Sequence, residues 1–234
     1  MKLTHMLAAV ALVALTFSAE AALVTWGAPQ TISGDSDVVT TGTFIAAANF
    51  GPTGVSGTTI NGVTFDPLPL IGGTTTTTSQ PLSSAYLTLL NSALLLSADT
   101  PVTVTLGGLT IGKNYLFQAW VNNSGRDFSL FSRGNFPTTL SDGLGNDVSL
   151  YAGDNGSGTG PGDSNLPSVL GEYVVGTFTA DATFQNFFVS SAEIPGVING
   201  FQFRQLAPAS VPEPGTALAG VMLAGCAGLR RRRG

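Results

Sequence analysis

Short runs in which apolar and polar side chains alternate recur along the chain, separated by turn residues. In the run 102–106, valine and leucine alternate with threonine, and a second, largely apolar run covers Asn114–Val121. Alternation with a period of two is typical of a strand that buries one face. Because Gly107 and Gly108 lie in the connection between the two runs, the pattern predicts a hairpin with one buried face.

Further strands are predicted from similar runs. They cover Leu23–Trp26, Thr43–Asn49, Val63–Phe65, two runs on either side of Ala180-Asp181-Ala182 within 171–190, and a last run Val197–Leu206 that carries Ile198, Phe201 and Phe203. The pair Asn61-Gly62 predicts a tight turn. A succession of short strands separated by turn signals is typical of a β-sandwich.

One segment has the helical period instead. Within 83–96, the apolar positions Tyr86, Leu89, Leu90, Ala93 and Leu94 are spaced as on one face of a helix, and a serine at 83 or 84 can cap its start. Two low-complexity stretches, Thr74–Ser79 and Ala152–Asn165, are predicted to be surface loops.

The composition agrees with an all-β fold. The 234 residues include 30 glycines and 13 prolines, only 10% are charged and 43% are hydrophobic. Such a chain is rich in turns, yet apolar enough to form a core. We therefore predict a single β-sandwich domain over 22–207 with one short helix.

The N-terminus predicts a secretory signal peptide. Lys2 precedes an apolar run from Met6 to Phe17, and Ala19-Glu20-Ala21 forms a small-residue cleavage site. This order of charge, apolar run and A-x-A site is typical of a signal peptide and distinguishes it from a buried helix. Cleavage after Ala21 by signal peptidase would leave a mature protein that starts at Ala22, exported by the secretion machinery.

Without its two ends, the chain has fewer types of side chain that can carry out catalysis or bind metals. The only histidine, His5, lies in the signal peptide, and the only cysteine, Cys226, lies near the C-terminus. Between Ala22 and Val211 there are four basic residues against twelve acidic ones, a net charge of −8. Nucleic acid is an unsuitable partner, since phosphate binding needs a basic surface. A domain without His or Cys also excludes a Ser-His-Asp triad, a Cys nucleophile, a His/Cys zinc site and a conventional haem site.

The positions of the acidic residues are more typical of turns than of catalytic or metal-binding sites. Most lie in glycine-rich segments, where Asp side chains cap turns, namely Asp35, Asp37, Asp142, Asp147, Asp154 and Asp163. Oxygen ligands for calcium are present at Asp142, Asn146, Asp147, Asp154 and Asp163, but their spacing does not match an EF-hand. We therefore predict no catalytic residue, no cofactor and no metal site, with a structural calcium ion as the alternative to plain loops.

One strand offers a candidate sugar-binding face. Gln118, Trp120 and Asn122 alternate away from the apolar positions of the same run, and Arg126 follows in the next loop. An indole with amide and guanidinium neighbours can stack on a pyranose ring and hydrogen-bond it. The competing interpretation is that both faces of this strand are buried, with Trp120 in the core.

The C-terminus has three successive parts. An extended linker over 208–215 contains Pro212-Glu213-Pro214, an uncharged apolar stretch covers Thr216–Leu229, and the tail 230–234 holds Arg230, Arg231, Arg232 and Arg233. Two prolines around one residue exclude a helix in the linker. As a helix, the apolar stretch extends about 21 Å, short of the roughly 30 Å hydrocarbon core. The arginines favour the cytoplasmic side of a short transmembrane helix.

These three parts resemble the PEP-CTERM sorting signal of exported proteins from Gram-negative bacteria that make extracellular polysaccharide. The resemblance covers the last 24 residues, Val211–Gly234. It implies that an exosortase in the inner membrane recognises and removes the tail, after which the protein reaches the cell surface or the extracellular matrix. A GPI signal follows the same logic, because its hydrophobic tail is read and then removed. An ordinary tail anchor is the competing interpretation.

The body of the chain is similar to exported proteins that carry the same tail. The resemblance rests on TWGAPQTISGDSDVVTTGT, LTIGKNYLFQAWVNNSGR, GEYVVGTFTADAT and INGFQFRQL. It implies a jelly-roll sandwich similar to galactose-binding-like domains. The sequence thus favours an exported, non-catalytic surface or matrix protein. The alternative is a carbohydrate-binding module, or a glycosidase that uses only carboxylates, acting on extracellular polysaccharide.

Overall fold

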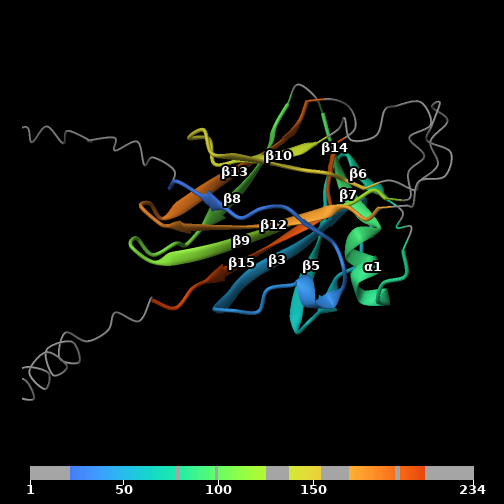
Figure 1. Ribbon diagram of the computed structural model, residues 1–234, viewed down its shortest axis with the longest axis horizontal. Helices are drawn as coiled ribbons and strands as arrows, with labels where there is room; N and C mark the ends of the chain where they lie inside the picture. The colour runs from blue at the N-terminus through green and yellow to red at the C-terminus, as the bar shows by residue number, and fades with distance from the viewer. Residues whose placement is uncertain are drawn as a thin grey trace, which may run out of the picture.

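Three β-sheets and one short α-helix form the part of the chain that the structure describes (Figure 1). The structure is a computed structural model, and it describes residues 22–76, 78, 80–97, 100–124, 137–153, 169–192 and 196–208. Strands account for 53% of the described residues, and several of the sheets are antiparallel. The predicted all-β class with one short helix is confirmed as a β-rich, sandwich-like fold.

The largest sheet has eight strands and runs through the middle of the molecule. Its order is β1 (Thr25–Trp26), β12 (Glu172–Thr179), β9 (Asn114–Val121), β15 (Gly200–Gln205), β3 (Thr43–Gly51), β5 (Val63–Pro69) and β4 (Thr58–Ile60), and β2 (Gln30–Thr31) also pairs with β12. Its pairs are antiparallel except for β3 with β5.

Two smaller sheets complete the fold. The four-stranded sheet has the order β11 (Asp147–Leu150), β10 (Thr138–Ser141), β13 (Phe184–Ser191) and β8 (Val102–Gly107). The three-stranded sheet has the order β14 (Gly196–Ile198), β7 (Ser92–Leu96) and β6 (Gly73–Thr75). A 3-10 turn, η1, covers Asp35–Asp37, and α1 covers Ser84–Leu90.

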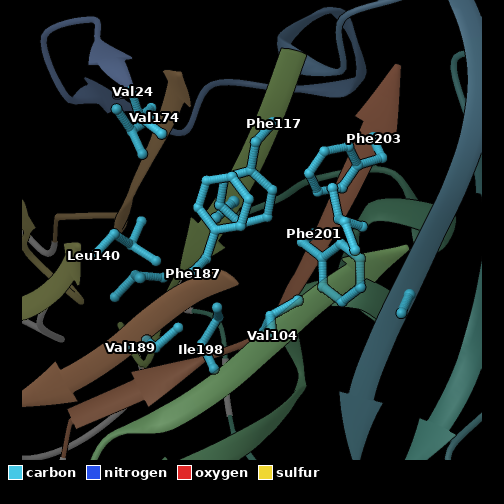
Figure 2. Packing of buried hydrophobic residues seen from close by; sticks show 14 of the residues in the cluster. Val24, Val104, Phe117, Leu140, Val174, Phe187, Val189, Ile198, Phe201 and Phe203 are labelled. Carbon is cyan, nitrogen blue, oxygen red and sulfur yellow. The ribbon is translucent and has the colours of Figure 1, made fainter. Parts of the chain in front are cut away.

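The main hydrophobic core lies between the eight-stranded and four-stranded sheets (Figure 2). Phe117 of β9 stacks on Phe187 of β13, with ring centroids 4.2 Å apart and planes 17° from parallel. Phe203 packs edge-on against Phe187 at 5.7 Å. Close-packed aromatic pairs of this kind stabilise a core by about 0.5–1.5 kcal/mol beyond the area they bury. The two inner faces are therefore joined mainly through aromatic rings.

A second core covers the opposite face of the eight-stranded sheet. Trp120 of β9 packs edge-on against Phe65 of β5 at 5.3 Å, and α1 adds Tyr86, Leu89 and Leu90. Strand β9 is consequently buried on both faces, one through Phe117 and the other through Trp120. This confirms the interpretation that both faces of the strand are core.

Most predicted strands exist, and several are longer or divided. The runs at 43–49 and 63–65 extend to β3 and β5, and the run at 23–26 shortens to β1. The tight turn is confirmed, because Asn61 and Gly62 both have positive φ, at 48° and 76°. The last predicted strand is split into β14 and β15 at Asn199.

Asn199 divides that strand because its buried side chain ties three segments together. Its Nδ2 donates to the carbonyl oxygens of Leu90, Ser92 and Asn122, at 2.9 to 3.1 Å. Its Oδ1 accepts a hydrogen bond from the backbone N–H of Asn122. A buried amide with all of these partners stabilises the fold, whereas an orphaned one would destabilise it.

The predicted hairpin between residues 102 and 121 is wrong. Strand β8 pairs with β13, whereas β9 pairs with β12 and β15, so the two strands belong to different sheets. The connection crosses the core from one layer to the other. Alternation shows that a strand buries one face, but the same pattern is satisfied whether the next strand pairs beside it or opposite it.

The predicted helix is correct at its start and wrong at its end. The Ser83 hydroxyl accepts a hydrogen bond from the N–H of Tyr86 at 3.1 Å, which is a true N-cap. The helix stops at Leu90, and Ala93 and Leu94 lie in β7 instead. A short apolar run is compatible with a helix and with a buried strand. Residues 92–96 form a strand because they pair with β6 and β14.

The stretch Thr74–Ser79 is only partly a loop, because residues 73–75 form β6 and pair with β7. The predicted signal peptide, the Pro-Glu-Pro motif, the membrane helix and arginine tail, and most of the 152–165 loop lie outside the described residues. No helix among the described residues is long and apolar enough to cross a membrane.

Candidate functional site

The candidate sugar-binding side chains lie inside the molecule. Gln118, Trp120 and Asn122 have 0% exposed surface. The Trp120 Nε1 donates a hydrogen bond to the Tyr86 hydroxyl at 2.8 Å, and the ring is covered by the second core. A sugar ring cannot stack on an indole with no accessible face. Arg126 lies outside the described residues, and the three described members of the predicted face are buried.

Gln118 instead holds a segment of the chain against the sheet. We call residues 38–42, which connect η1 to β3, the strap. The Gln118 amide donates to the Asp37 carbonyl at 2.7 Å and accepts from the Val39 N–H at 3.1 Å. Gln202, its cross-strand partner on β15, donates to the Val39 carbonyl at 3.0 Å. Two glutamines thus replace the hydrogen bonds that a neighbouring strand would give the strap.

Arg204 fastens the far end of the strap. Its Nε donates to the Thr41 carbonyl at 2.9 Å, and its Nη2 donates to the carbonyls of Thr40 and Gly42 at 2.8 and 2.9 Å. The side chain is buried, with 7% of its surface exposed, and burial lowers the pKa of the guanidinium below its usual value. The fixed fork of an arginine suits this arrangement of three carbonyl oxygens.

The strap also requires a glycine at its end. Gly42 has φ of +87°, and a Cβ there would lie 2.5 Å from the carbonyl oxygen of Gln205. Both the backbone conformation and the close approach favour glycine. Among the described residues, Gln202 Oε1 and Arg204 Nη1 are buried without a hydrogen-bond partner. They are an acceptor and a donor two residues apart on β15.

Asp37 anchors the segment that precedes the strap. Its carboxylate accepts hydrogen bonds from the Ser33 N–H and hydroxyl at 2.7 and 2.6 Å, the Gly34 N–H at 2.9 Å and the Tyr86 hydroxyl at 3.2 Å. Burial, followed by the charge of Asp37, raises the pKa of Tyr86 far above its usual value. The hydroxyl therefore stays protonated and relays a hydrogen bond from Trp120 to Asp37.

Asp142 has a similar structural role in the β10–β11 turn. It is fully buried, and its carboxylate accepts from the N–H groups of Val24, Leu144 and Asn146 at 2.8 to 3.2 Å. The bonds to Leu144 and Asn146 confirm the turn interpretation for this residue. The described residues hold no group of three or more His, Cys, Asp or Glu side chains placed to bind a metal ion. Asp154 and Asp163 lie outside them.

Removal of calcium is expected to leave the stability of the protein unchanged. The carboxylate of Asp142 is already saturated by backbone donors, so folding needs no cation there. The melting temperature measured with and without EDTA should agree within about 2 °C, because a ligand that does not bind cannot shift unfolding. A drop in EDTA that added calcium reverses would contradict this and would point to the segment 142–163.

An open groove lies at one end of the eight-stranded sheet, between the segment before β1 and the residue after β15. Its volume is about 480 Å³, and it is lined by Ala22, Leu23, Thr25, Asn114, Thr177, Phe178, Thr179, Asp181 and Leu206. The Thr179 hydroxyl donates to the Asn114 side-chain oxygen at 2.7 Å. The hydroxyl, amide and carboxylate groups that line the groove can hydrogen-bond a neutral polar ligand. The groove is open to solvent and carries one exposed carboxylate, Asp181.

Sequence reasoning missed Gln202, Arg204 and Asn199. A usable signal exists for the first two, because they alternate with Phe201 and Phe203 and so belong to the face opposite the main core. Their amide and guanidinium groups on a buried strand indicate partners from the backbone. The identity of those partners depends on the strap, whose path does not follow from local patterns.

Neither a known protein family nor a curated protein matches this sequence. A solved structure of a calcium-binding mutant of beta-glucuronidase 2 from Bacteroides uniformis is similar over 69% of this chain. The match covers 18% of that protein, with 14% sequence identity and a TM-score of 0.44. It is a distant similarity in a sandwich-like fold to part of that protein and assigns no family.

Proposed function

We propose that this chain is an exported, non-catalytic protein of the cell surface or extracellular matrix, sorted by its C-terminal signal. The observation that carries the proposal is the three-part ending, in which Pro212-Glu213-Pro214 precedes a short apolar stretch and four arginines. Signal peptidase would remove the first 21 residues, and an exosortase would act at the ending. The body that is delivered would be a jelly-roll-like sandwich.

Four of the described carboxylates, those of Asp35, Asp37, Asp142 and Glu172, are engaged in hydrogen bonds, which supports the non-catalytic part of this proposal. Asp37 and Asp142 are saturated by hydrogen bonds from their own surroundings, as described above. Asp35 accepts from the Ser83 hydroxyl at 2.6 Å, and Glu172 accepts from the Tyr151 N–H at 2.8 Å. Glycoside hydrolysis needs two carboxyl groups on either side of an open substrate site, about 5 to 10 Å apart. Carboxylates that are hydrogen-bonded within turns and strands are not available as catalytic groups for glycoside hydrolysis.

Cell fractionation tests the proposed sorting. Deleting Thr216–Gly234 is expected to move the protein from its final location to the soluble periplasmic fraction, because the membrane hold is lost and the signal peptide is kept. The full-length protein, expressed in a host that has an exosortase, should appear at the cell surface or in the medium. Identical distributions of the two proteins would contradict the proposal.

A further inference from the structure

One end of the sandwich brings together both ends of the described chain. The register of the large sheet pairs Asn114 with Thr179 and Tyr115 with Gln205, so β9 begins where β12 and β15 finish. The N–H of Leu206 donates to the Asn114 carbonyl at 2.8 Å, and Ala22 lines the adjacent groove. We call this the terminal end. In Figure 1 it is the end from which the blue and the red segments leave the sheets.

Large apolar side chains are exposed at the terminal end. Leu23 is 60% exposed, Ile111 61%, Leu144 48% and Phe184 39%. We call these four residues the apolar rim.

Hydrogen bonds place the elements that carry the rim side by side. The Gly112 N–H donates to the Ala180 carbonyl at 2.7 Å, and the Leu109 N–H donates to the Thr183 carbonyl at 3.0 Å. The Asn146 side chain donates to the Val24 carbonyl at 3.0 Å. The rim is therefore spread over neighbouring loops and strand ends.

Such a rim has an energetic cost in water. Loop tips normally carry Gly, Asn, Asp and Ser, whereas this end presents leucine, isoleucine and phenylalanine. Covering apolar surface stabilises it by about 25 cal/mol per Å². Apolar side chains gathered at one end of a domain are typical of a surface that meets an apolar partner.

The proposed membrane segment follows this end closely in the sequence. The described residues end at Pro208, and the apolar stretch begins at Thr216, eight residues later. Eight residues span at most about 28 Å when fully extended. With the apolar stretch inserted, the terminal end would be held within that distance of the lipid surface. A tether of this length gives a millimolar effective concentration, at which a weak contact becomes populated.

We propose that the apolar rim rests on the lipid surface while the C-terminal stretch is in the membrane. This inference rests on the proposed function and adds an orientation to it, with the terminal end facing the bilayer. Shallow insertion of apolar side chains at the interface is the physical basis. Lys113, exposed beside Ile111, can contact lipid phosphate, whereas Asp147 and Asp181 oppose a strongly anionic surface. The contact is therefore apolar more than electrostatic.

A fluorescent probe at the rim tests the orientation. The full-length protein is purified from membranes of a host that lacks the processing enzyme, with Cys226→Ser and Ile111→Cys as the labelling site. It is reconstituted into vesicles of phosphatidylethanolamine and phosphatidylglycerol that contain a lipid-attached quencher. The probe should shift to the blue and be quenched by about twofold or more, since interfacial side chains enter the headgroup region.

Ile71 supplies the matched control. It follows Pro69, whose strand β5 ends beside Gly51, at the opposite end of the sheet, and its exposed fraction of 105% is the largest among the exposed apolar residues of the described chain. The same probe on Ile71→Cys should stay in water. Adding Leu23→Ser and Leu144→Ser to the Ile111→Cys protein should reduce the quenching. Equal signals from the two labelled sites would overturn the proposal.

Flotation of the same samples separates this inference from the proposed function. A protein that does not float with the vesicles has no membrane-inserted tail, which contradicts the membrane step of the proposed function. A protein that floats while the probe at position 111 reports water contradicts the rim contact alone. A protein that floats with a quenched probe at 111 and an unquenched probe at 71 supports both.

Discussion

Replacing Pro212, Glu213 and Pro214 together with alanine is expected to leave a full-length protein in the inner membrane. The alanines remove the two prolines, which we expect to hold the extended segment that the processing enzyme reads. The apolar stretch and the arginines are unchanged, so insertion and orientation persist. The change should therefore convert a released protein into an anchored one, which an immunoblot of fractionated cells detects by size and location.

The matched control is the deletion of Thr216–Gly234, which removes the membrane hold and keeps the motif. The two changes should have opposite effects, one retaining the protein in the membrane and the other releasing it. If the ending is an ordinary tail anchor, the alanine substitutions will alter neither size nor location. That outcome, with a wild-type protein that keeps its C-terminus, would reject the sorting signal.

Arg204→Ala is expected to destabilise the fold by about 3 kcal/mol, because three carbonyl oxygens of the strap lose their charged donor at once. Those groups can regain water only if the strap leaves the sheet. Leaving would expose the second core. Urea unfolding of the purified protein should show a lower midpoint.

Two further variants distinguish the effect of losing the planar guanidinium group from the effect of losing a positive charge. Arg204→Lys keeps a cation but offers a single ammonium group, so it should recover only part of the stability. Lys113→Ala removes an exposed cation and should change the free energy of unfolding by less than about 0.5 kcal/mol. If Arg204→Ala were as mild as Lys113→Ala, the strap would owe its position to something other than this guanidinium.

The fold was predictable as far as local patterns carry information. Local patterns located strands such as the one predicted at Thr43–Asn49, which extends to Gly51, and the Asn-Gly pair located a turn, because both are properties of a few consecutive residues. Pairing between strands is not local. The run at 102–106 pairs with Phe184–Ser191, about eighty residues away, and the core decides that choice.

The role of the buried polar side chains of β9 could not be predicted from local patterns either. The sequence predicts Gln118 and Trp120 as candidate sugar-binding residues because amides and indoles are common in such sites. The same groups also satisfy buried backbone and hydroxyl partners, and the residue types alone do not separate the two roles. Only the path of the strap and the position of Tyr86 show that this face is filled by the protein itself.

The mass of the intact protein recovered from the cell surface or the medium is the most direct test of the proposed sorting. The proposed sorting predicts a single chain that starts at Ala22 and lacks Cys226 and the four arginines, since both ends would be removed as processing signals. N-terminal sequencing and a thiol-labelling mass shift would verify the two ends separately. A mature protein that ends at Gly234 would contradict the proposed sorting.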